Sequence, residues 1–279
     1  MGPHNMPDRV QSIDPIEEKR RGSVPKEEED RTVEEALLAN LDPLFEDHLV
    51  EEVVRPVKAG KEAVVYCCRA GESLGCEFVA AKIYRPIETR SFKRDAVYQQ
   101  GRERGSRPDA RVLRALGKKS QRGRVHKFNA WIAHEMRTLE VLSAAGANVP
   151  LPYERRGPVI LMTYVGNAEH PAPVLATVDL GRAEAKRLYF VALSNVELLL
   201  RHHRVHADLS AFNILFWNGS LTIIDFPQAV DPRYNDDAFD LLIRDVRNIN
   251  EYFSGNDVAI VDPIEHALTL WRKHVDRNR

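Results

Sequence analysis

Two short runs of strand-forming residues flank the dipeptide Asn218-Gly219. The runs are NILFW before it and SLTIID after it, and an Asn-Gly connection between such runs predicts a hairpin with a type I′ turn. A short turn fixes the register of its strands, so Asn213, at the start of one strand, should lie close to Asp225, at the end of the other. Asp208 stands five residues before Asn213. The pattern therefore predicts three polar side chains converging in an apolar segment.

Two other apolar patterns each contain one charged residue. Residues 78–84 read as an apolar strand that contains Lys82, and such a lysine should face a cleft and an anionic partner. Residues 129–143 read as a helix, with Glu135 on its apolar stripe three residues after Ile132. A carboxylate buried on that stripe is costly unless a cation is paired with it, which predicts an ion pair between Glu135 and Lys82. The alternatives are an edge-strand lysine and a solvated glutamate.

The remaining hydrophobic patterns outline further elements. Residues 36–45, ALLANLDPLF, predict a short helix, and residues 158–165, PVILMTYV, predict a buried strand. Residues 183–203 form a long amphipathic pattern that leads directly to His206. A helical pattern follows from Asp240, DLLIRDVRNINEYF.

The converging polar residues suggest metal chemistry. Two acids in so hydrophobic a segment are costly unless a positive charge lies against them. Mg²⁺ takes oxygen ligands and is usually held by one or two carboxylates together with substrate phosphates. In kinases one Asp accepts the hydroxyl proton, while an Asn and a second Asp hold the metal. Asp208, Asn213 and Asp225 fit these three roles. The alternative is an ordinary buried hairpin, with Asp208 as a helix cap and Asn213 in a turn.

The motif HADLS-x-x-N followed by IID-x-x-Q resembles the RIO kinase family of the protein-kinase-like superfamily. Ordinary protein kinases read HRDLK-x-x-N and DFG at these places, whereas this chain has Ala207 for the arginine and Ser210 for the lysine. Pro227 follows Asp225-Phe226, where most RIO members have a small polar residue. Proline fixes φ and has no N–H, so it cannot make the glycine-dependent flip of a regulated activation segment.

Upstream segments extend the resemblance. KAGKEAVVY, residues 58–66, is similar to the STGKEANVY phosphate loop of the family, and AHEMRTL is similar to its EKEMRNL stretch. In the kinase interpretation Lys82 holds the α- and β-phosphates and pairs with the helix glutamate. The residues that the resemblance assigns to nucleotide binding are Gly60, Lys61, Lys82, Glu135, Met162 at the gate to the inner pocket, and Thr163 and Val165 in the hinge.

The resemblance implies an α+β, bilobal protein-kinase-like (RIO) fold. Its N-lobe would be an antiparallel sheet with one helix, and its C-lobe would be mostly helical. We expect an acidic, disordered tail over residues 1–32, the N-lobe over 33–165 with a short N-terminal helix, and the C-lobe with the catalytic and metal-binding loops over 166–279.

Composition is typical of a soluble globular enzyme. The chain has 279 residues, 43% of them hydrophobic, and a formal net charge of −1. No stretch approaches the about 20 apolar residues of a membrane span, so we expect no membrane partner. The segment MGPHNMPDRV lacks the apolar core of a signal peptide. Three cysteines without C-x-x-C spacing predict reduced thiols and a cytoplasmic location.

The small net charge hides a segregation. Residues 1–52 hold 15 acidic against 6 basic residues, and residues 85–127 hold 14 basic against 4 acidic ones. RIO kinases also carry a flexible insertion at the place of the basic segment 85–127. A basic insert could bind RNA or a ribosomal particle through phosphates. The alternatives are a solvated loop and a partner for the acidic segment of the same chain.

The predicted activity is phosphoryl transfer from Mg²⁺·ATP, with Mn²⁺ as an alternative ion, by an atypical serine/threonine protein kinase of RIO type. Asp208 would orient the acceptor, and Asn213 and Asp225 would bind the metal. Some RIO enzymes pass phosphate onto the metal-binding aspartate, which makes Asp225 a candidate aspartyl-phosphate site and ATPase activity an expectation. Alternatives are a small-molecule phosphotransferase of the aminoglycoside type and an ATP-gated factor associated with ribosomes or RNA. The protein acceptor is not predicted.

Overall fold

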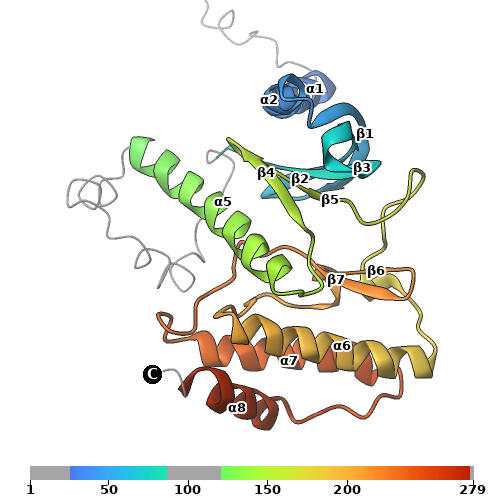
Figure 1. The fold of residues 1–279 in the computed structure, drawn as a ribbon, viewed down its shortest axis with the longest axis vertical. Coiled ribbons are helices and arrows are strands. Elements are labelled where there is room, and N and C mark those ends of the chain that lie inside the picture. The colour runs from blue at the N-terminus through green and yellow to red at the C-terminus, as the bar shows by residue number, and fades with distance from the viewer. Residues whose placement is uncertain (1–25, 87–120, 277–279) are drawn as a thin grey trace, which may run out of the picture. The chain divides into compact units, whose positions relative to one another are not determined.

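The computed structural model of this chain describes residues 26–86 and 121–276, and Figure 1 shows their elements. The chain divides into two compact units with the boundary after Ala39. In the first unit a helix, α1, spans Lys26–Leu38. It begins inside the segment 1–32 for which the sequence predicted disorder, so that prediction is wrong from Lys26 onward; residues 1–25 lie outside the described residues. The run KEEEDRTVEEALL contains strong helix formers and neither glycine nor proline.

Two short helical segments follow α1, and the boundary between the two units falls inside the first of them. The predicted helix over residues 36–45 is divided among the end of α1, the 3₁₀ turn η1 and the helix α2. Leu41 and Leu44 are fully buried, and α2 contacts the first strand of the sheet. These segments span Ala39–Leu41 (η1) and Asp42–Glu46 (α2).

A five-stranded antiparallel sheet follows, with the strand order β1-β2-β3-β5-β4. Strand β3 lies at its centre and carries Lys82, and its burial explains the apolar run that the sequence showed. The 3₁₀ turn η2 (Glu72–Leu74) lies between β2 and β3. The strands are β1 (Val50–Ala59), β2 (Ala63–Ala70), β3 (Phe78–Tyr84), β4 (Pro152–Arg156) and β5 (Val159–Thr163).

One helix, α5 (Gln121–Ala144), packs beside this sheet and contacts β4 (Figure 1). Its buried stripe includes Ile132, Leu139 and Leu142, as the periodicity predicted. The helix starts eight residues earlier than the predicted residue 129. Residues 121–127 of the basic segment 85–127 are therefore helical and not part of a flexible insert, while residues 87–120 lie outside the described residues.

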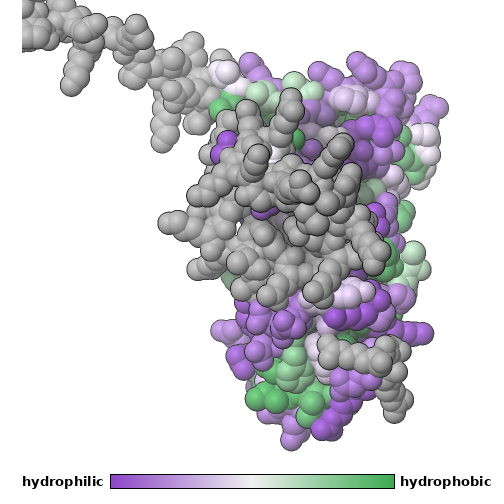
Figure 2. Space-filling view, turned by 90° about the vertical axis from the view of Figure 1, so that its left-hand side faces the viewer, coloured by the Kyte–Doolittle hydropathy of each residue, from purple (hydrophilic) through white to green (hydrophobic). Residues whose placement is uncertain are grey.

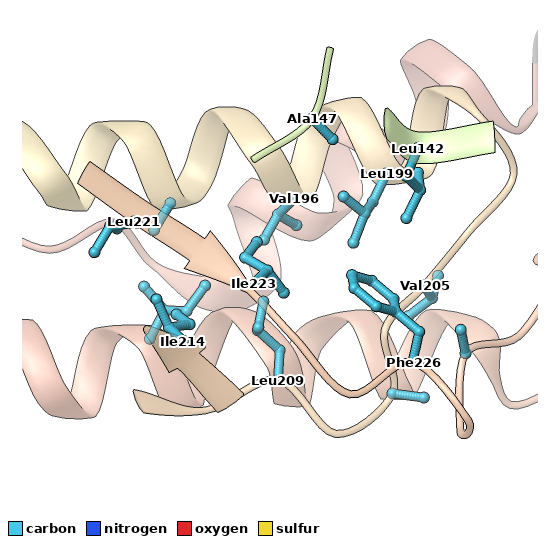
Figure 3. Close-up of a cluster of buried hydrophobic side chains, with 14 of the residues drawn as sticks. Leu142, Ala147, Val196, Leu199, Val205, Leu209, Ile214, Leu221, Ile223 and Phe226 are labelled. Carbon is cyan, nitrogen blue, oxygen red and sulfur yellow. The ribbon is translucent and has the colours of Figure 1, made fainter. Parts of the chain in front are cut away.

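Helices dominate the second half of this unit. A hydrophobic cluster lies between α6 and the two-stranded hairpin β6–β7, and Figure 3 shows the Phe226 ring pointing toward Leu199 with Val205 beside it. A 3₁₀ turn, η4 (Leu175–Thr177), precedes α6, and another, η5 (Ala211–Asn213), precedes the hairpin. The other elements are α6 (Arg182–Arg201), β6 (Ile214–Trp217), β7 (Ser220–Ile223), α7 (Ala238–Ser254) and α8 (Pro263–His274).

The loop after α5 ties the sheet half to the helical half. The Asn148 amide donates to Asn195 Oδ1 at 2.7 Å, and the Asn148 carbonyl accepts from Ile223 N at 2.7 Å. Asn195 is buried in α6, so these bonds replace contacts with water. They hold the loop after α5 against Ile223, the last residue of β7, which stands two residues before Asp225.

The described surface on the face shown in Figure 2 is mostly hydrophilic, with hydrophobic groups gathered mainly toward its lower end. Among the helices of the described residues, none is long and apolar enough to cross a membrane.

Candidate active site

The β6–β7 hairpin has the predicted register. Asn218 and Gly219 both have positive φ, at 47° and 75°, as a type I′ turn requires. The residue that begins β6 pairs with the residue that ends β7, and Ile224 N donates to the Asn213 carbonyl at 2.9 Å. The structure thus brings the backbone of Asn213 next to the residue that precedes Asp225.

The structure also brings together Lys82 and Glu135. Lys82 Nζ lies 2.7 Å from Glu135 Oε1 and 2.8 Å from Asp225 Oδ1. The exposed fractions of the side chains are 10% for Lys82, 1% for Glu135 and 43% for Asp225. One buried cation is therefore shared by a fully buried carboxylate and by a second carboxylate that opens to solvent.

Electrostatics keep Lys82 and Asp225 charged, whereas burial raises the pKa of Glu135 against the opposing charge of Lys82. Burial alone would lower the pKa of Lys82, but the charges of Asp225 and Glu135 outweigh it and raise the pKa above its ordinary value. Burial likewise would raise the pKa of Asp225, and the charge and hydrogen bond of Lys82 outweigh it and lower the pKa. Lys82 is therefore protonated and Asp225 ionised at neutral pH.

The loop that carries Asp208 is held by α7. Asp245, 1% exposed, accepts from the Ala207 amide at 2.8 Å and from the Leu209 amide at 3.0 Å. Arg244 donates to the Ala207 carbonyl, and Asn248 Nδ2 donates to the Leu209 carbonyl at 2.8 Å. These bonds fix the backbone on both sides of Asp208. Burial raises the pKa of Asp245 to about 7, against its hydrogen bonds with the two amides.

Sequence reasoning missed Asp245, although the sequence carries a signal for it. Asp245 lies on the buried stripe of α7 with Leu241, Leu242 and Ile249. The argument that selected Glu135, a carboxylate on an apolar helical stripe, applies equally here. Its partners differ, because backbone amides and not a lysine satisfy the charge.

Asp208 lies within electrostatic reach of Asp225. The residue as a whole is exposed, although its carboxylate is partly screened from water, and Asn213 Nδ2 donates to the Asp208 carbonyl at 2.9 Å. Burial of the carboxylate and the charge of Asp225 raise the pKa of Asp208. Two repelling carboxylates with a carboxamide beside them form a set of hard oxygen ligands, which fits Mg²⁺. No group of three or more His, Cys, Asp or Glu side chains suited to a metal occurs in the described part of the chain. Phosphate and water oxygens would have to complete the coordination.

The backbone at Asp225 has a positive φ, and hydrogen bonds of the next residue, Phe226, stabilise it. Asp225 has φ of 72°, a conformation that non-glycine residues adopt mainly where the surroundings enforce it. Phe226 N donates to Glu135 Oε1 at 3.2 Å, and the Phe226 carbonyl accepts from Ala229 N at 3.0 Å. Pro227 therefore occupies the second position of a β-turn, which its fixed φ suits. This turn accommodates Pro227 without the loss of a backbone hydrogen bond within it.

His206, two residues before Asp208, is a structural neighbour of this segment. Its Nε2 lies 3.1 Å from the Ile224 carbonyl, and its ring lies 4.7 Å from the Phe226 ring, centroid to centroid. Burial lowers the pKa of His206 to about 4, so the imidazole is neutral at pH 7. A neutral ring that donates to the Ile224 carbonyl links the loop of Asp208 to the loop of Asp225.

The predicted phosphate loop is the tight connection between β1 and β2. Gly60 N donates to the Ala63 carbonyl at 2.9 Å, and a Cβ on Gly60 would lie 3.2 Å from that carbonyl oxygen. Arg85 Nε donates to the Gly60 carbonyl at 3.1 Å. Lys61 is exposed at the tip and makes no hydrogen bond or ion pair with the described residues.

The predicted hinge lies at the end of β5. Met162 is buried in the core. The Thr163 amide donates to the Leu151 carbonyl and the Thr163 hydroxyl accepts from the Leu151 amide, both at 2.9 Å. The Val165 carbonyl accepts from Ala172 N at 2.9 Å. These bonds occupy the Thr163 amide and the Val165 carbonyl, so the candidate contacts of these two residues with a base are the Thr163 carbonyl and the Val165 amide.

Arg55 on β1 clamps the segment after the hinge. It donates to Tyr164 Oη at 2.7 Å and to the carbonyls of Asn167 and Glu169 at 3.0 and 2.9 Å. These partners are more than 100 residues away in the sequence. Sequence reasoning missed Arg55, because no local pattern signals such a contact.

The sheet with its paired lysine and helix glutamate, followed by a helical half with the Asp208 and Asp225 loops, defines a protein-kinase-like fold. The predicted α+β bilobal class is confirmed. The family model described as the RIO domain matches residues 64–265. The chain belongs to the RIO family.

Named relatives agree with this assignment. The chain is 32% identical over 214 residues to human serine/threonine-protein kinase RIO1, covering 76% of this chain and 35% of the relative. It is 30% identical over 225 residues to the RIO-type serine/threonine-protein kinase Rio1 of Haloferax volcanii, covering 81% of this chain and 71% of the relative. The chain spans 35%, 60% and 38% of the human, Encephalitozoon cuniculi and Caenorhabditis elegans relatives.

Solved structures show the same fold. The Rio2 kinase–ADP/Mg²⁺–phosphoaspartate complex from Chaetomium thermophilum aligns with a TM-score of 0.58 and 20% identity, over 87% of this chain and 70% of that one. Another structure of the same kinase aligns with a TM-score of 0.54 and 21% identity, over 84% and 68%.

Proposed function

We propose that this chain transfers the γ-phosphoryl group of ATP, with Mg²⁺, as an atypical serine/threonine protein kinase. The observation that supports this most strongly is the convergence of Lys82, Glu135 and Asp225 beside the loop of Asp208 and Asn213. Kinase catalysis consists mainly of positioning and of stabilising the charge on the transferred group, which these residue types supply. Membership of the RIO family, whose relatives are named as kinases, supports the same activity.

In this proposal each residue has one role. Lys82 binds the α- and β-phosphates and keeps its pair with Glu135. Asp225 and Asn213 would hold Mg²⁺, which would neutralise charge on the phosphates, and Asp225 would then give up its contact with Lys82. Asp208 orients the acceptor hydroxyl and accepts its proton, and its raised pKa favours that step. The Thr163 carbonyl and the Val165 amide bind the adenine edge, with Gly60 and Lys61 over the phosphates.

A second outcome of the same chemistry is an aspartyl-phosphate. One carboxylate oxygen of Asp225 would attack the γ-phosphorus as the bond to the departing ADP oxygen breaks, and water would later hydrolyse the acyl phosphate. The 43% exposure of Asp225 favours this reaction, because the carboxylate is accessible. The Rio2 complex with a phosphoaspartate, a fold neighbour, makes it worth testing.

The test follows γ-labelled ATP with Mg²⁺, tracking label on protein and free phosphate in parallel. We expect turnover by the wild-type chain and its loss in Asp208→Ala and Asp225→Ala. Asp240→Asn, which changes an exposed acid on α7, is the matched control and should retain activity. Substantial turnover in either alanine variant would refute the assignment.

The chemical stability of the label separates the two outcomes. Acid-stable label on protein indicates a Ser/Thr kinase, whereas transient, hydroxylamine-sensitive label with free phosphate indicates an ATPase with an aspartyl-phosphate at Asp225. Label transferred to free aminoglycosides but to no protein would favour the small-molecule phosphotransferase. Binding of an anionic macromolecule by residues 85–127 stays a prediction from the sequence.

A further inference from the structure

A row of directly opposed residues crosses the face of the sheet from which Lys82 reaches Glu135. Lys58 on β1 stands opposite Val65 on β2, and Val65 stands opposite Lys82 on β3. Directly opposed residues of an antiparallel pair point to the same face. Lys82 reaches Glu135 and Asp225 from that face. The β1–β2 pairing is irregular between Pro56 and Lys58 and regular from Lys58 to Ala59, so the pair with Val65 places Lys58 on the same face. With neighbouring strands about 4.8 Å apart, the two lysines emerge about 10 Å apart, with Val65 between them.

The two lysines of this row differ in their partners. Lys82 is buried and engaged by two carboxylates. Lys58 is exposed, and its side chain makes no hydrogen bond or close ion pair with residues 26–86 or 121–276. Its charge also contributes, after the effects of Lys82 and His206, to lowering the pKa of Asp225 against the opposing effect of burial. Lys58 is thus an uncommitted cation within electrostatic reach of the carboxylate assigned to metal binding.

From this arrangement we infer that Lys58 is a further phosphate-binding residue, whose ammonium binds the terminal phosphoryl group of ATP from the side opposite Lys82. The inference rests on the proposed function. A lysine suits this role because its charge sits on a flexible four-carbon stem that can follow a moving phosphoryl group. The STGKEANVY pattern of the family has serine at this position, so the cation is a feature of this chain.

Lys58 and Lys61 are therefore not equivalent. Lys61 belongs to the connection between the strands, and no cross-strand pair fixes the direction of its side chain. Lys58 lies three residues before Lys61, and its direction is set by its cross-strand pair with Val65. Sequence reasoning selected Lys61 from the motif, whereas strand register selects Lys58.

A simpler role for Lys58 must be separated from this one. Strand β1 lies at an edge of the sheet, and lysines on edge strands discourage aggregation. A protective lysine would affect solubility but not the dependence of binding on the number of phosphates. The number of phosphates is therefore the quantity to vary.

The experiment measures dissociation constants of AMP, ADP and the β,γ-imido analogue of ATP with Mg²⁺ by calorimetry. Wild type, Lys58→Met and Lys58→Arg are compared, with Lys186→Met, an exposed lysine on α6, as the matched control. For Lys58→Met we expect about tenfold weaker binding of the ATP analogue, a smaller loss for ADP and no change for AMP, since a charge-assisted contact is lost. Lys58→Arg should keep most of the affinity, and Lys186→Met all of it.

Two results would overturn the inference alone. Unchanged affinity of Lys58→Met for the ATP analogue would show that the ammonium does not touch the terminal phosphate. An equal loss for all three nucleotides would show a structural role for Lys58. If the wild-type chain bound none of the nucleotides, the proposed function itself would fail and the inference with it.

Discussion

The two halves of the candidate site are held by different forces. On the sheet side, one buried lysine is shared between two carboxylates, so the geometry depends on a balance of full charges. On the helical side, a buried carboxylate and two polar side chains of α7 hold the loop of Asp208 through its backbone. In the proposed function the charged side exchanges partners, because Lys82 would give up Asp225 when phosphates bind. The bonds from α7 to the loop backbone would keep Asp208 in place during that exchange.

The largest effect should come from breaking the charged side. Lys82→Met leaves Glu135 buried without its cation, and removal of one partner of a buried pair costs about 3–5 kcal/mol. Urea unfolding of both proteins at pH 7 would measure the loss, and nucleotide binding should disappear as well. The double variant Lys82→Met/Glu135→Gln should recover much of the stability but no binding. A single variant as stable as the wild type would mean that Glu135 is not ionised in the folded state.

The backbone-held side should be nearly as sensitive. Asp245→Ala removes the acceptor of two buried amides, and each unsatisfied donor costs about 1–3 kcal/mol. We expect a loss of about 2–4 kcal/mol in urea unfolding. The turnover of any folded fraction should also fall, because Asp208 is no longer positioned. Asp240→Asn on the same helix, at an exposed position, should stay within about 0.5 kcal/mol of wild type. A small effect of Asp245→Ala would show that other contacts hold the loop.

Sequence predicted one side of this comparison better than the other. Lys82 and Glu135 are recognisable because each interrupts an apolar pattern, and the Asn218-Gly219 turn sets the approach of Asn213 to Asp225. Asp245 interrupts a pattern too, but its partners are backbone amides, which a sequence does not display.

The roles of Arg55 and Lys58 depend on tertiary contacts and on strand register, which the identity of a residue does not reveal. Arg55 binds carbonyls far along the chain, and only the strand register places Lys58 on the same face of the sheet as Lys82. The helical start at Lys26 was misjudged because acidic charge outweighed helix propensity in the prediction.

Titration should separate the two sides further. The pKa of Asp245 is raised from 3.8 to about 7, so the folded state binds its proton more tightly than the unfolded state. Its contribution to the free energy of unfolding is complete below pH 3.8 and is lost as pH rises to about 7. The stability difference between wild type and Asp245→Asn should therefore shrink over that range. The difference between wild type and Lys82→Met should persist at pH 7, because the raised pKa of Lys82 keeps it protonated there. A difference for Asp245→Asn that stays constant with pH would mean that the two amides keep Asp245 ionised.

The smallest effect concerns the strain that the backbone-held side stores. Ala207 has φ of 68°, a left-handed conformation that costs a non-glycine residue about 1–2 kcal/mol. Ala207→Gly relieves this strain but adds about 0.4–1 kcal/mol of unfolded-state entropy, so the net change should be small, with activity retained. Ala207→Val adds a β-branched side chain to the same conformation at a fully buried position, and it should destabilise clearly more. If both variants were equally stable, the bonds from Asp245 and Arg244 would not be holding Ala207 in this conformation. The loop would then be as adaptable as the charged side.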